Sequence, residues 1–410
     1  MSDEPSPATT DDAPRRKAKV AKKRTVGRVI VISAVVLALV TGLGMIYLIR
    51  HLNGNIETLS LDEIDGERPE KIYDGNGEPL NILVMGDDTR EGAGNEIDGE
   101  GGGGSDTTIL VHLSADRSRA FAVSIPRDSI VDRPECTNSA ADTEVMWNAA
   151  YSVGGELCTI EQFEANTDIR VDHFVVVDFN GFGEMVDAVG GVPVCVPEDI
   201  DDPQREIFVP AGDPSVLSGD QALDYVRARY VGELAQQNDI SRIKRQQTFI
   251  AALVREVKSA GTLTRLDRVV NFLDAATRSL KTDEELGSVT RLGKLAMQLQ
   301  SIGLDEVKFV TLPTEYFETG SEFSGKVYWT EDAVSIWQLL NEDKALPKRL
   351  LDGSISAEPP ATSSEGETPT EPTGSETATP SEPTESETPT EPTETPETTE
   401  PEEQIPGICA

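Results

Sequence analysis

The pattern of hydrophobic and polar positions divides the chain into three parts. Residues Val29–Ile49 contain no charged side chain. As a helix with a rise of about 1.5 Å per residue, this run is long enough to cross a bilayer core of roughly 30 Å. Between Leu80 and Asn341, short apolar runs alternate with segments whose apolar residues recur every three or four positions. From about Gly353 to Gln404, almost no apolar residue occurs. The chain is therefore expected to hold one membrane span, one globular body and a polar tail.

The body is predicted to be a single α/β domain, because strand and helix patterns alternate throughout it. The expected strands are Leu80–Met85, Thr108–Leu113, Ala120–Ile125, Val171–Asp178, Pro193–Val196 and Glu306–Leu312. The expected helices are Trp147–Val153, Thr159–Thr167, Phe179–Val189, a helix from Ser218 toward Arg227, Asp239–Ala260, Leu263–Ala276, Thr282–Leu299 and Thr330–Asn341. Polar turns follow several of these strands, and open α/β sheets place their sites at such strand ends.

The helix expected to begin near Asp239 places polar residues at the start of the face that should be buried. A polar start to a buried stripe has two interpretations, a site lined by the helix or a structural network of salt bridges. The helix alone does not decide between them. The residues that share this face are Arg242, Gln246, Ile250, Leu253 and Val257.

Residues 1–28 are polar and carry a cluster of lysines and arginines just before the apolar run. Such basic residues keep the amino terminus in the cytoplasm, so the body is expected outside the cell membrane. No small-x-small cleavage pattern follows the run, which favours an uncleaved signal anchor over residues 29–49 rather than a cleaved signal peptide. Residues 50–79 carry little pattern and are interpreted as a linker.

The tail, residues 353–404, consists of near-repeats of Glu, Thr, Pro and Ser, and residues 405–410 end the chain with Cys409. Such a composition cannot offset the entropy of folding, so the tail is expected to be disordered. It would serve as a spacer or glycosylated stalk, or simply as a solubilising linker. Much of the formal charge of −37 lies in this tail, and the body is moderately acidic. An acidic body argues against nucleic acid as a partner.

The chain has four cysteines, which can oxidise outside the membrane. Cys136 and Cys158 bracket a polar, loop-like segment, so a disulfide between them is favoured. Cys195 lies in an apolar strand and is either a buried thiol or the partner of Cys409. Three histidines are too few for a histidine-rich metal site.

Two carboxylates at strand ends suggest a different kind of metal site. Asp88 and Asp106 each stand beside a small or hydroxyl-bearing residue. Carboxylates without histidine or thiolate partners suit magnesium, or alternatively manganese, with substrate phosphates completing the coordination. Aspartates that merely cap turns are the alternative interpretation.

Arginines gather at the same strand ends and at the ends of helices. Guanidinium groups bind phosphates through paired hydrogen bonds. Together with a divalent cation they supply what phosphoryl transfer requires. The chain has no Walker lysine loop and no dinucleotide fingerprint. It also has no Gly-x-Ser-x-Gly elbow and no histidine base, which argues against acyl hydrolysis. The arginines are Arg90, Arg127, Arg227, Arg229, Arg242 and Arg245.

Several sequence blocks, in the same order along the chain, resemble the LytR-CpsA-Psr family. The resemblance covers about Leu80–Leu280 and implies a catalytic domain over residues 80–345, with a central mixed β-sheet flanked by helices. The cysteine pattern is similar to that of actinobacterial members. The blocks are Asn81–Arg90, Ser105–Thr107, Val123–Asp128, Asn148–Gly155, Asp172–Phe182, Val186–Gly191, Ala222–Arg229 and Asp239–Gln247.

The resemblance implies a membrane-anchored transferase of wall glycopolymers. Members of the family move a polymer, or its linkage unit, from a polyprenyl-pyrophosphate carrier to a peptidoglycan hydroxyl and release polyprenyl phosphate. By motif, Asp88 and Asp106 would hold magnesium and the arginines would surround the pyrophosphate. Gln246 would orient the head group, and Asp239 would support the arginines. The residues expected around the lipid tail are Phe182, Val186, Phe249 and Leu253.

The chain departs from the family pattern at a few positions. Gly104 stands where the family often has an arginine, Met146 and Trp147 replace a common Lys-Ile pair, and Asn238 replaces a glycine. Two other functions also remain open. One is hydrolysis of polyprenyl or nucleotide pyrophosphates with water as the acceptor. The other is a non-enzymatic role as a wall-binding or regulatory membrane protein.

Overall fold

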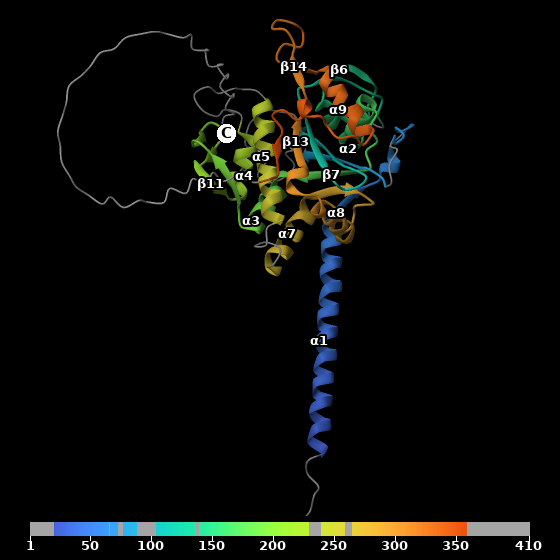
Figure 1. The fold of residues 1–410 in the computed structure, drawn as a ribbon, viewed down its shortest axis with the longest axis vertical. Coiled ribbons are helices and arrows are strands. Elements are labelled where there is room, and N and C mark those ends of the chain that lie inside the picture. Colours follow the sequence, from blue (N-terminus) through green and yellow to red (C-terminus); the bar gives the residue numbers. More distant parts are fainter. Residues whose placement is uncertain are drawn as a thin grey trace, which may run out of the picture. The chain divides into compact units, whose positions relative to one another are not determined.

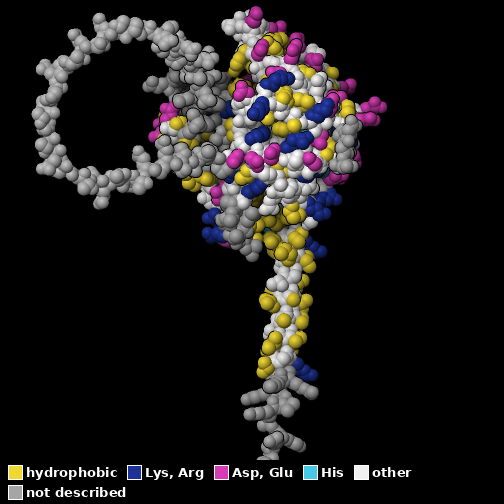
Figure 2. All heavy atoms as spheres, viewed as in Figure 1, with side chains coloured by type: hydrophobic (Ala, Val, Ile, Leu, Met, Phe, Trp, Pro, Cys, Tyr) yellow, Lys and Arg dark blue, Asp and Glu magenta, His cyan; other side chains and the backbone are white. Residues whose placement is uncertain are grey.

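The computed structural model describes residues 20–64, 66–72, 77–87, 104–136, 139–228, 239–258 and 265–358. It forms two compact units, one that ends at Asn55 and one that starts at Ile56. The first unit contains helix α1 (Val20–Asn55), the long blue helix of Figure 1. Its stretch Val26–Asn55 is long and apolar enough, by length and composition, to cross a membrane. Exposed hydrophobic side chains cover this helix in Figure 2.

The second unit is built on a mixed sheet of eight strands. Strands β2, β7, β4 and β13 run parallel to one another and end at the same edge, where the antiparallel strand β3 begins. We call this edge the site edge. In spatial order the strands are β1 (Glu57–Leu59), β12 (Leu280–Asp283), β7 (His173–Asp178), β2 (Leu80–Asp87), β3 (Ser105–Leu113), β4 (Ala120–Ile125), β13 (Val307–Thr311) and β16 (Ile355–Ser356).

Helices cover both faces of the sheet, because alternate residues of a strand point to opposite sides. Phe121, Val123 and Ile125 of β4 pack in the main core with helices α2 (Ala149–Thr167) and α9 (Glu331–Asn341). Ala122 lies on the other face, in a cluster that contains Ala251 of helix α5 (Asp239–Lys258). Figure 1 shows α2 and α9 on one side of the sheet and α5 on the other.

Beside the sheet, a second group of elements packs against α5 around its own apolar cluster. This side cluster includes Val186, Tyr225 and Phe249, all fully buried. Helix α7 (Leu266–Ser279) packs on helix α3 of this group. The elements of the side cluster are α3 (Phe179–Val189), β8 (Val192–Val196), β9 (Ile200–Asp202), β10 (Ile207–Val209), β11 (Gly212–Leu217) and α4 (Gly219–Arg227).

The sequence places most of these elements correctly, with shifts of a few residues at their ends. Strand β4 and helix α3 have the predicted bounds, and Gly190 ends α3 in a left-handed conformation. The two short helices predicted before and after Gly154 form one run, α2, interrupted at Gly155 by non-helical dihedral angles (φ 66°, ψ −151°). Because φ is positive there, glycine fits this interruption better than other residues.

One predicted helix is wrong at its start. The sequence predicts a helix over Thr282–Leu299, but Leu280–Asp283 forms strand β12 and helix α8 extends only over Val289–Ser301. The side chain of Ser288 caps α8 by accepting a hydrogen bond from the backbone of Arg291. Strand β12 pairs with β7, so pairing with a distant strand overrides the local helical pattern.

The sheet also extends into both segments that flank the predicted domain. Strand β1, in the segment interpreted as a linker, pairs with β12. Strand β16, in the segment expected to be disordered from Gly353, pairs with β13, and Ala357 is fully buried beside it. Each strand has only two or three residues, too few to give a periodic pattern. In the described part of the body, 3₁₀ turns span Leu61–Glu63, Leu304–Glu306 and Lys348–Leu350.

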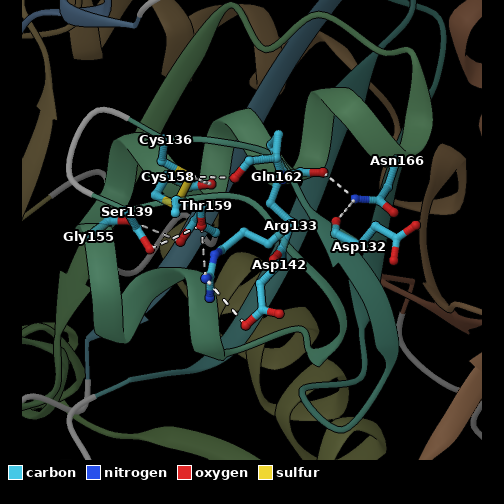
Figure 3. The surroundings of a disulfide bond; sticks show 12 residues. Asp132, Arg133, Cys136, Ser139, Asp142, Gly155, Cys158, Thr159, Gln162 and Asn166 are labelled. Atoms are coloured by element: carbon cyan, nitrogen blue, oxygen red, sulfur yellow. Dashed lines mark hydrogen bonds and ion pairs between the residues drawn. A yellow bond between two sulfur atoms is a disulfide. The ribbon is translucent and has the colours of Figure 1, made fainter.

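The predicted disulfide between Cys136 and Cys158 is present, with Cα atoms 5.2 Å apart. It ties the segment after the hairpin strand β5 (Ile130–Arg133) to α2, as Figure 3 shows. Strand β6 (Asp142–Met146) completes that hairpin. Cys195 is also disulfide-bonded, so it is not a buried thiol. Its suggested partner, Cys409, lies outside the described residues.

Candidate active site

The site edge brings Asp106 and Arg127 together through strand register. Thr108 of β3 pairs with Ile125 of β4, and continuing this antiparallel register places Asp106 opposite Arg127. The guanidinium of Arg127 donates a hydrogen bond from Nη1 to Oδ1 of Asp106 over 2.7 Å. A strand-end aspartate and the arginine after the next strand therefore face each other at the site edge.

The first turn of α5 completes this arrangement. Arg242 donates to Oδ2 of Asp106 over 3.1 Å and to the backbone oxygen of Asp106 over 3.2 Å. It also pairs with Asp239 one turn earlier on the helix. Nε of Arg127 lies 3.6 Å from Oδ1 of Asp239. These four residues, which we call the arginine–aspartate cluster, are mostly buried, and Arg242 is only 3% exposed. The salt-bridge network considered from the sequence is thus present.

Burial and charge act in opposite directions on Arg127. Burial favours a lower pKa for its guanidinium, but the carboxylates of Asp106 and Asp239 outweigh this effect and raise the pKa above its ordinary value. Among the described residues, the buried Nε atoms of Arg127 and Arg242 have no hydrogen-bond partner. Buried donors normally have acceptors, so these two donors are suited to an anion bound beside the cluster.

Further along α5, Arg245 and Gln246 turn toward α4. Arg245 is 1% exposed and donates to the backbone oxygen of Ala228, while Nε2 of Gln246 donates to the backbone oxygen of Val226 over 3.4 Å. Burial lowers the pKa of Arg245 to about 10. The nearby cation Arg242 acts in the same direction. Arg245 therefore remains charged at neutral pH, and its positive charge is held inside the protein beside the cluster.

Arg227 lies at the end of α4, where its guanidinium carbon sits 4.5 Å from the centroid of the Phe179 ring. Phe179 begins α3 directly after β7, one of the strands that end at the site edge. An aromatic face attracts a cation by about 0.5–2 kcal/mol. This contact therefore holds the side chain of Arg227 close to the site edge.

The four residues expected around a lipid tail all belong to the side cluster. Phe182 and Phe249 pack with ring centroids 5.4 Å apart. Val186 and Phe249 are fully buried, whereas Phe182 and Leu253 are half-buried. The structure thus brings all four together, with two that support the cluster from within and two that reach its surface.

Three predicted site residues, Asp88, Arg90 and Arg229, lie outside the described residues. Strand β2 is described to Asp87, which pairs with Ser105 at the start of β3. Asp87 also lies close to Tyr151 of α2. Burial is the largest cause that raises the pKa of the Tyr151 phenol, and the carboxylates of Glu156 and Asp87 raise it further. The end of β2 is therefore adjacent to the start of β3, where Asp106 is located.

Two polar residues near the cluster, Gln247 and Lys326, are not among the site residues predicted from the sequence. Gln247 is fully buried on α5, donates to Oγ of Ser124 over 2.9 Å and accepts from Oγ1 of Thr311 over 3.4 Å. Gln247 lies four residues before the buried Ala251 on the same face of α5. The signal in the sequence that could have revealed it was therefore a polar residue within an apolar stripe. Lys326 binds Oδ1 of Asp128 over 2.7 Å, and no local pattern marks it.

The mixed sheet, with helices on both faces and a cluster of arginines and aspartates at one edge, defines an α/β domain with a charged site at that edge. The LytR_cpsA_psr family model matches residues 51–345. The chain therefore belongs to the LytR-CpsA-Psr family.

Individual relatives have similar sequences and folds. The chain is similar to the cell wall biosynthesis protein LcpA of Corynebacterium glutamicum, with 30% identity over 73% of this chain and 62% of LcpA. It is also 28% identical to the polyisoprenyl-teichoic acid–peptidoglycan teichoic acid transferase TagV of Bacillus subtilis, over 77% of each protein. The crystal structure of TagV superimposes with a TM-score of 0.50 at 25% identity, covering 66% of this chain and 100% of TagV.

Proposed function

We propose that this protein is a membrane-anchored phosphotransferase of cell wall assembly. It moves a glycopolymer, or its linkage unit, from a polyprenyl-pyrophosphate carrier to a peptidoglycan hydroxyl. The observation that carries this proposal is the arginine–aspartate cluster, in which buried guanidinium donors of Arg127 and Arg242 are available to an anion. The transferase activity named for TagV supports the same reaction class.

In this reaction the acceptor hydroxyl oxygen attacks the phosphorus that carries the glycopolymer. A new P–O bond forms, the bond from that phosphorus to the bridging oxygen breaks, and polyprenyl phosphate leaves with the electron pair. The hydroxyl proton passes to a base, for which Asp128 and Asp88 are candidates. Arg127 and Arg242 stabilise the charge that develops on the phosphate oxygens, which is the main task in phosphoryl transfer.

Residues farther along α5 are suited to bind the departing polyprenyl phosphate. Arg245 keeps a buried positive charge beside Arg242, and Gln246 lies one residue further along the helix. Phe249 and Leu253 follow one and two turns later in the side cluster. We infer that the leaving phosphate is held at Arg245 and Gln246 and that the isoprenoid tail extends along the surface of the side cluster.

The proposed location is the cell membrane, with α1 as a single-pass signal anchor. The basic residues before the span support a cytoplasmic amino terminus and an extracytoplasmic catalytic body. The Cys136–Cys158 disulfide supports an oxidising compartment. The similarity of the chain to LcpA of Corynebacterium glutamicum supports an actinobacterial type of transferase. The partners are thus the lipid-linked donor, peptidoglycan and the membrane, without nucleic acid.

We also propose that the site takes Mg²⁺, or Mn²⁺ in its place. Asp106 offers a hard oxygen donor at the position where guanidinium groups would bind phosphates, which fits an ion held by one or two carboxylates and substrate oxygens. Asp88 would be the second carboxylate. When bound, the cation would neutralise charge on the pyrophosphate. Among the described residues, the one group of three potential metal ligands that lie close together is Cys136, Cys158 and Glu161, and its two cysteines form the disulfide.

Removal of divalent cations is expected to stop the transfer. With excess EDTA, wall-bound product should fall to background, and added Mg²⁺ should restore it. The Asp106→Asn variant should weaken Mn²⁺ binding, read by electron paramagnetic resonance, by about tenfold or more, because it removes one charged ligand. Full transfer by the chelated protein, or unchanged Mn²⁺ binding by Asp106→Asn, would contradict the metal proposal.

The decisive test of the function is a transfer assay with the full chain in detergent micelles. A radiolabelled lipid-linked glycopolymer and purified peptidoglycan serve as donor and acceptor. The expected result is label bound to the wall together with free polyprenyl phosphate. Cleaved donor with no wall-bound label would instead support the pyrophosphatase alternative. A wall-binding or regulatory role predicts that Asp106→Ala still restores wall polymer in a deletion strain. The transferase function predicts that this variant does not restore it.

A further inference from the structure

A hairpin with five aromatic residues, of which Tyr316 and Tyr328 are exposed, stands next to the arginine–aspartate cluster. It consists of strands β14 (Thr314–Tyr316) and β15 (Val327–Trp329), joined by residues 317–326. Its loop extends beyond the rest of the body near the β14 label of Figure 1. The hairpin follows β13 and lies outside Leu80–Leu280, where the sequence blocks occur. Its aromatic residues are Tyr316, Phe317, Phe323, Tyr328 and Trp329.

The hairpin is attached to the segment that carries Arg127. The backbone N–H of Val327 donates to the backbone oxygen of Asp128 over 3.2 Å, and Ser129 forms a β-bridge with Val327. Lys326 binds the carboxylate of Asp128, which lies 3.8 Å from Nε of Arg127. Backbone and side-chain contacts therefore fix the hairpin relative to the cluster.

Most of its aromatic rings have packing partners that make the hairpin rigid. The ring of Trp329 lies 5.8 Å from those of Trp147 and Trp337 in the main core. Phe317 contacts Phe323 and Tyr328, with ring centroids 5.2 Å and 5.1 Å apart. These contacts explain why those residues are aromatic, but they do not involve Tyr316.

Tyr316 lies near the cluster and is nevertheless 53% exposed. Partial burial, followed by the carboxylates of Asp239 and Asp128, raises the pKa of its phenol. Its strand partner is Val327, whose backbone is bonded to Asp128. An exposed ring is thus held near the carboxylates of Asp239 and Asp128 by a rigid support, which is the arrangement expected of a binding surface.

Tyr316 of β14 lies near the start of α5, and this position indicates which substrate it contacts. Tyr316 is near Asp239 in the first turn of α5, whereas Phe249 of the side cluster lies ten residues later. At a rise of about 1.5 Å per residue, this separation is roughly 15 Å along the helix. Arg242 and Arg245 lie between them. In phosphoryl transfer, the attacking oxygen approaches in line with the leaving oxygen. If the polyprenyl phosphate leaves toward the side cluster, the attacking hydroxyl comes from the side of Tyr316.

We propose that Tyr316, presented by the β14–β15 hairpin, is the stacking residue of a subsite for the acceptor glycan of peptidoglycan. This inference rests on the proposed transferase function. One face of a pyranose ring is lined with C–H groups, which pack against the electron-rich face of an aromatic ring. Hydroxyl groups at the sugar edge donate to carboxylates, and Asp128 supplies such an acceptor near Tyr316. The subsite holds the acceptor while its hydroxyl meets the phosphorus near Arg127.

The test uses the full chain in detergent micelles and soluble glycan strands from peptidoglycan as the acceptor. Transfer is measured while acceptor and donor are varied separately, for Tyr316→Ala, Tyr316→Phe and Tyr316→Trp. Loss of the ring should raise the KM for the glycan strands about tenfold, as expected for one aromatic stacking contact. The KM for the lipid-linked donor should not change. Tyr316→Phe and Tyr316→Trp should stay close to the unmodified protein, because they retain the ring.

Met297 supplies a control of similar size, since it is 63% exposed on α8, which packs at the opposite edge of the sheet beside Leu113 and Ala120. Met297→Ala should leave both KM values unchanged. An unchanged acceptor KM in Tyr316→Ala would overturn the proposal, as would a loss in Tyr316→Phe equal to that in Tyr316→Ala. A separate binding titration with the glycan strands, read by tryptophan fluorescence, distinguishes failure of the Tyr316 subsite from failure of the proposed transferase function. Binding that requires the Tyr316 ring supports the subsite even if no transfer occurs. Equal binding by Tyr316→Ala, or no binding at all, overturns it.

Discussion

Replacement of Arg242 by alanine is expected to reduce transfer by about 10³-fold or more, the scale of losing a guanidinium that stabilises a phosphoryl-transfer transition state. Arg242 contacts both the carboxylate and the backbone of Asp106 and pairs with Asp239, so its removal affects the centre of the cluster. The measurement is wall-bound label in the transfer assay, with circular dichroism to confirm that the variant is folded.

Two further variants separate charge, geometry and general surface effects. Arg242→Lys keeps the positive charge but loses the paired donors, so it should recover only a small part of the activity. Arg278→Ala removes an arginine that is 52% exposed in its side chain and pairs with Glu184 and Asp274 on the surface. Its activity should match that of the unmodified protein. A folded Arg242→Ala variant with normal transfer would show that the cluster is only a structural salt-bridge network.

Replacement of Phe249 by alanine is expected to destabilise the body by about 3–5 kcal/mol, the usual cost of deleting a buried phenylalanine side chain. Phe249 is fully buried, and its ring packs against Phe182 and Tyr225. Part of the lost stability comes from the apolar surface that is no longer buried, and part comes from the cavity that remains. Denaturant unfolding of the full chain in micelles, followed by fluorescence of its three tryptophans, of which Trp147 and Trp337 are buried, provides the measurement.

Leu253 offers a matched comparison on the same helix. It also belongs to the side cluster, but it is only half-buried. Leu253→Ala should therefore cost about 1–2 kcal/mol, less than the range for fully buried leucine. If Phe249→Ala were no more destabilising than Leu253→Ala, Phe249 would have to line an open pocket rather than support the cluster from within.

Much of the candidate site follows from local sequence because each of its members stands at a boundary that sequence marks. Asp106 begins a strand, Arg127 follows the proline that ends another, and Asp239 and Arg242 occupy the first turn of a helix. The register of β3 and β4 then brings the first two together. Lys326 and Tyr316 could not be found in this way, since their closeness to Asp128 depends on a hairpin about two hundred residues later in the chain.

The sequence by itself determined the apolar helix near the amino terminus, the α/β class, the positions of the longer helices and of six strands, and the Cys136–Cys158 disulfide. These features depend on local periodicity, composition and turn residues, which are written along the chain. The tertiary structure decided that Leu280–Asp283 is a strand, that β1 and β16 join the sheet, and that Gln247 is buried. Such features depend on pairing and packing between distant segments, which can override the weak local preferences of short stretches. The polar start of α5 illustrates both contributions. Its sequence marks a site or a salt-bridge network, and only the fold shows which carboxylates its arginines contact.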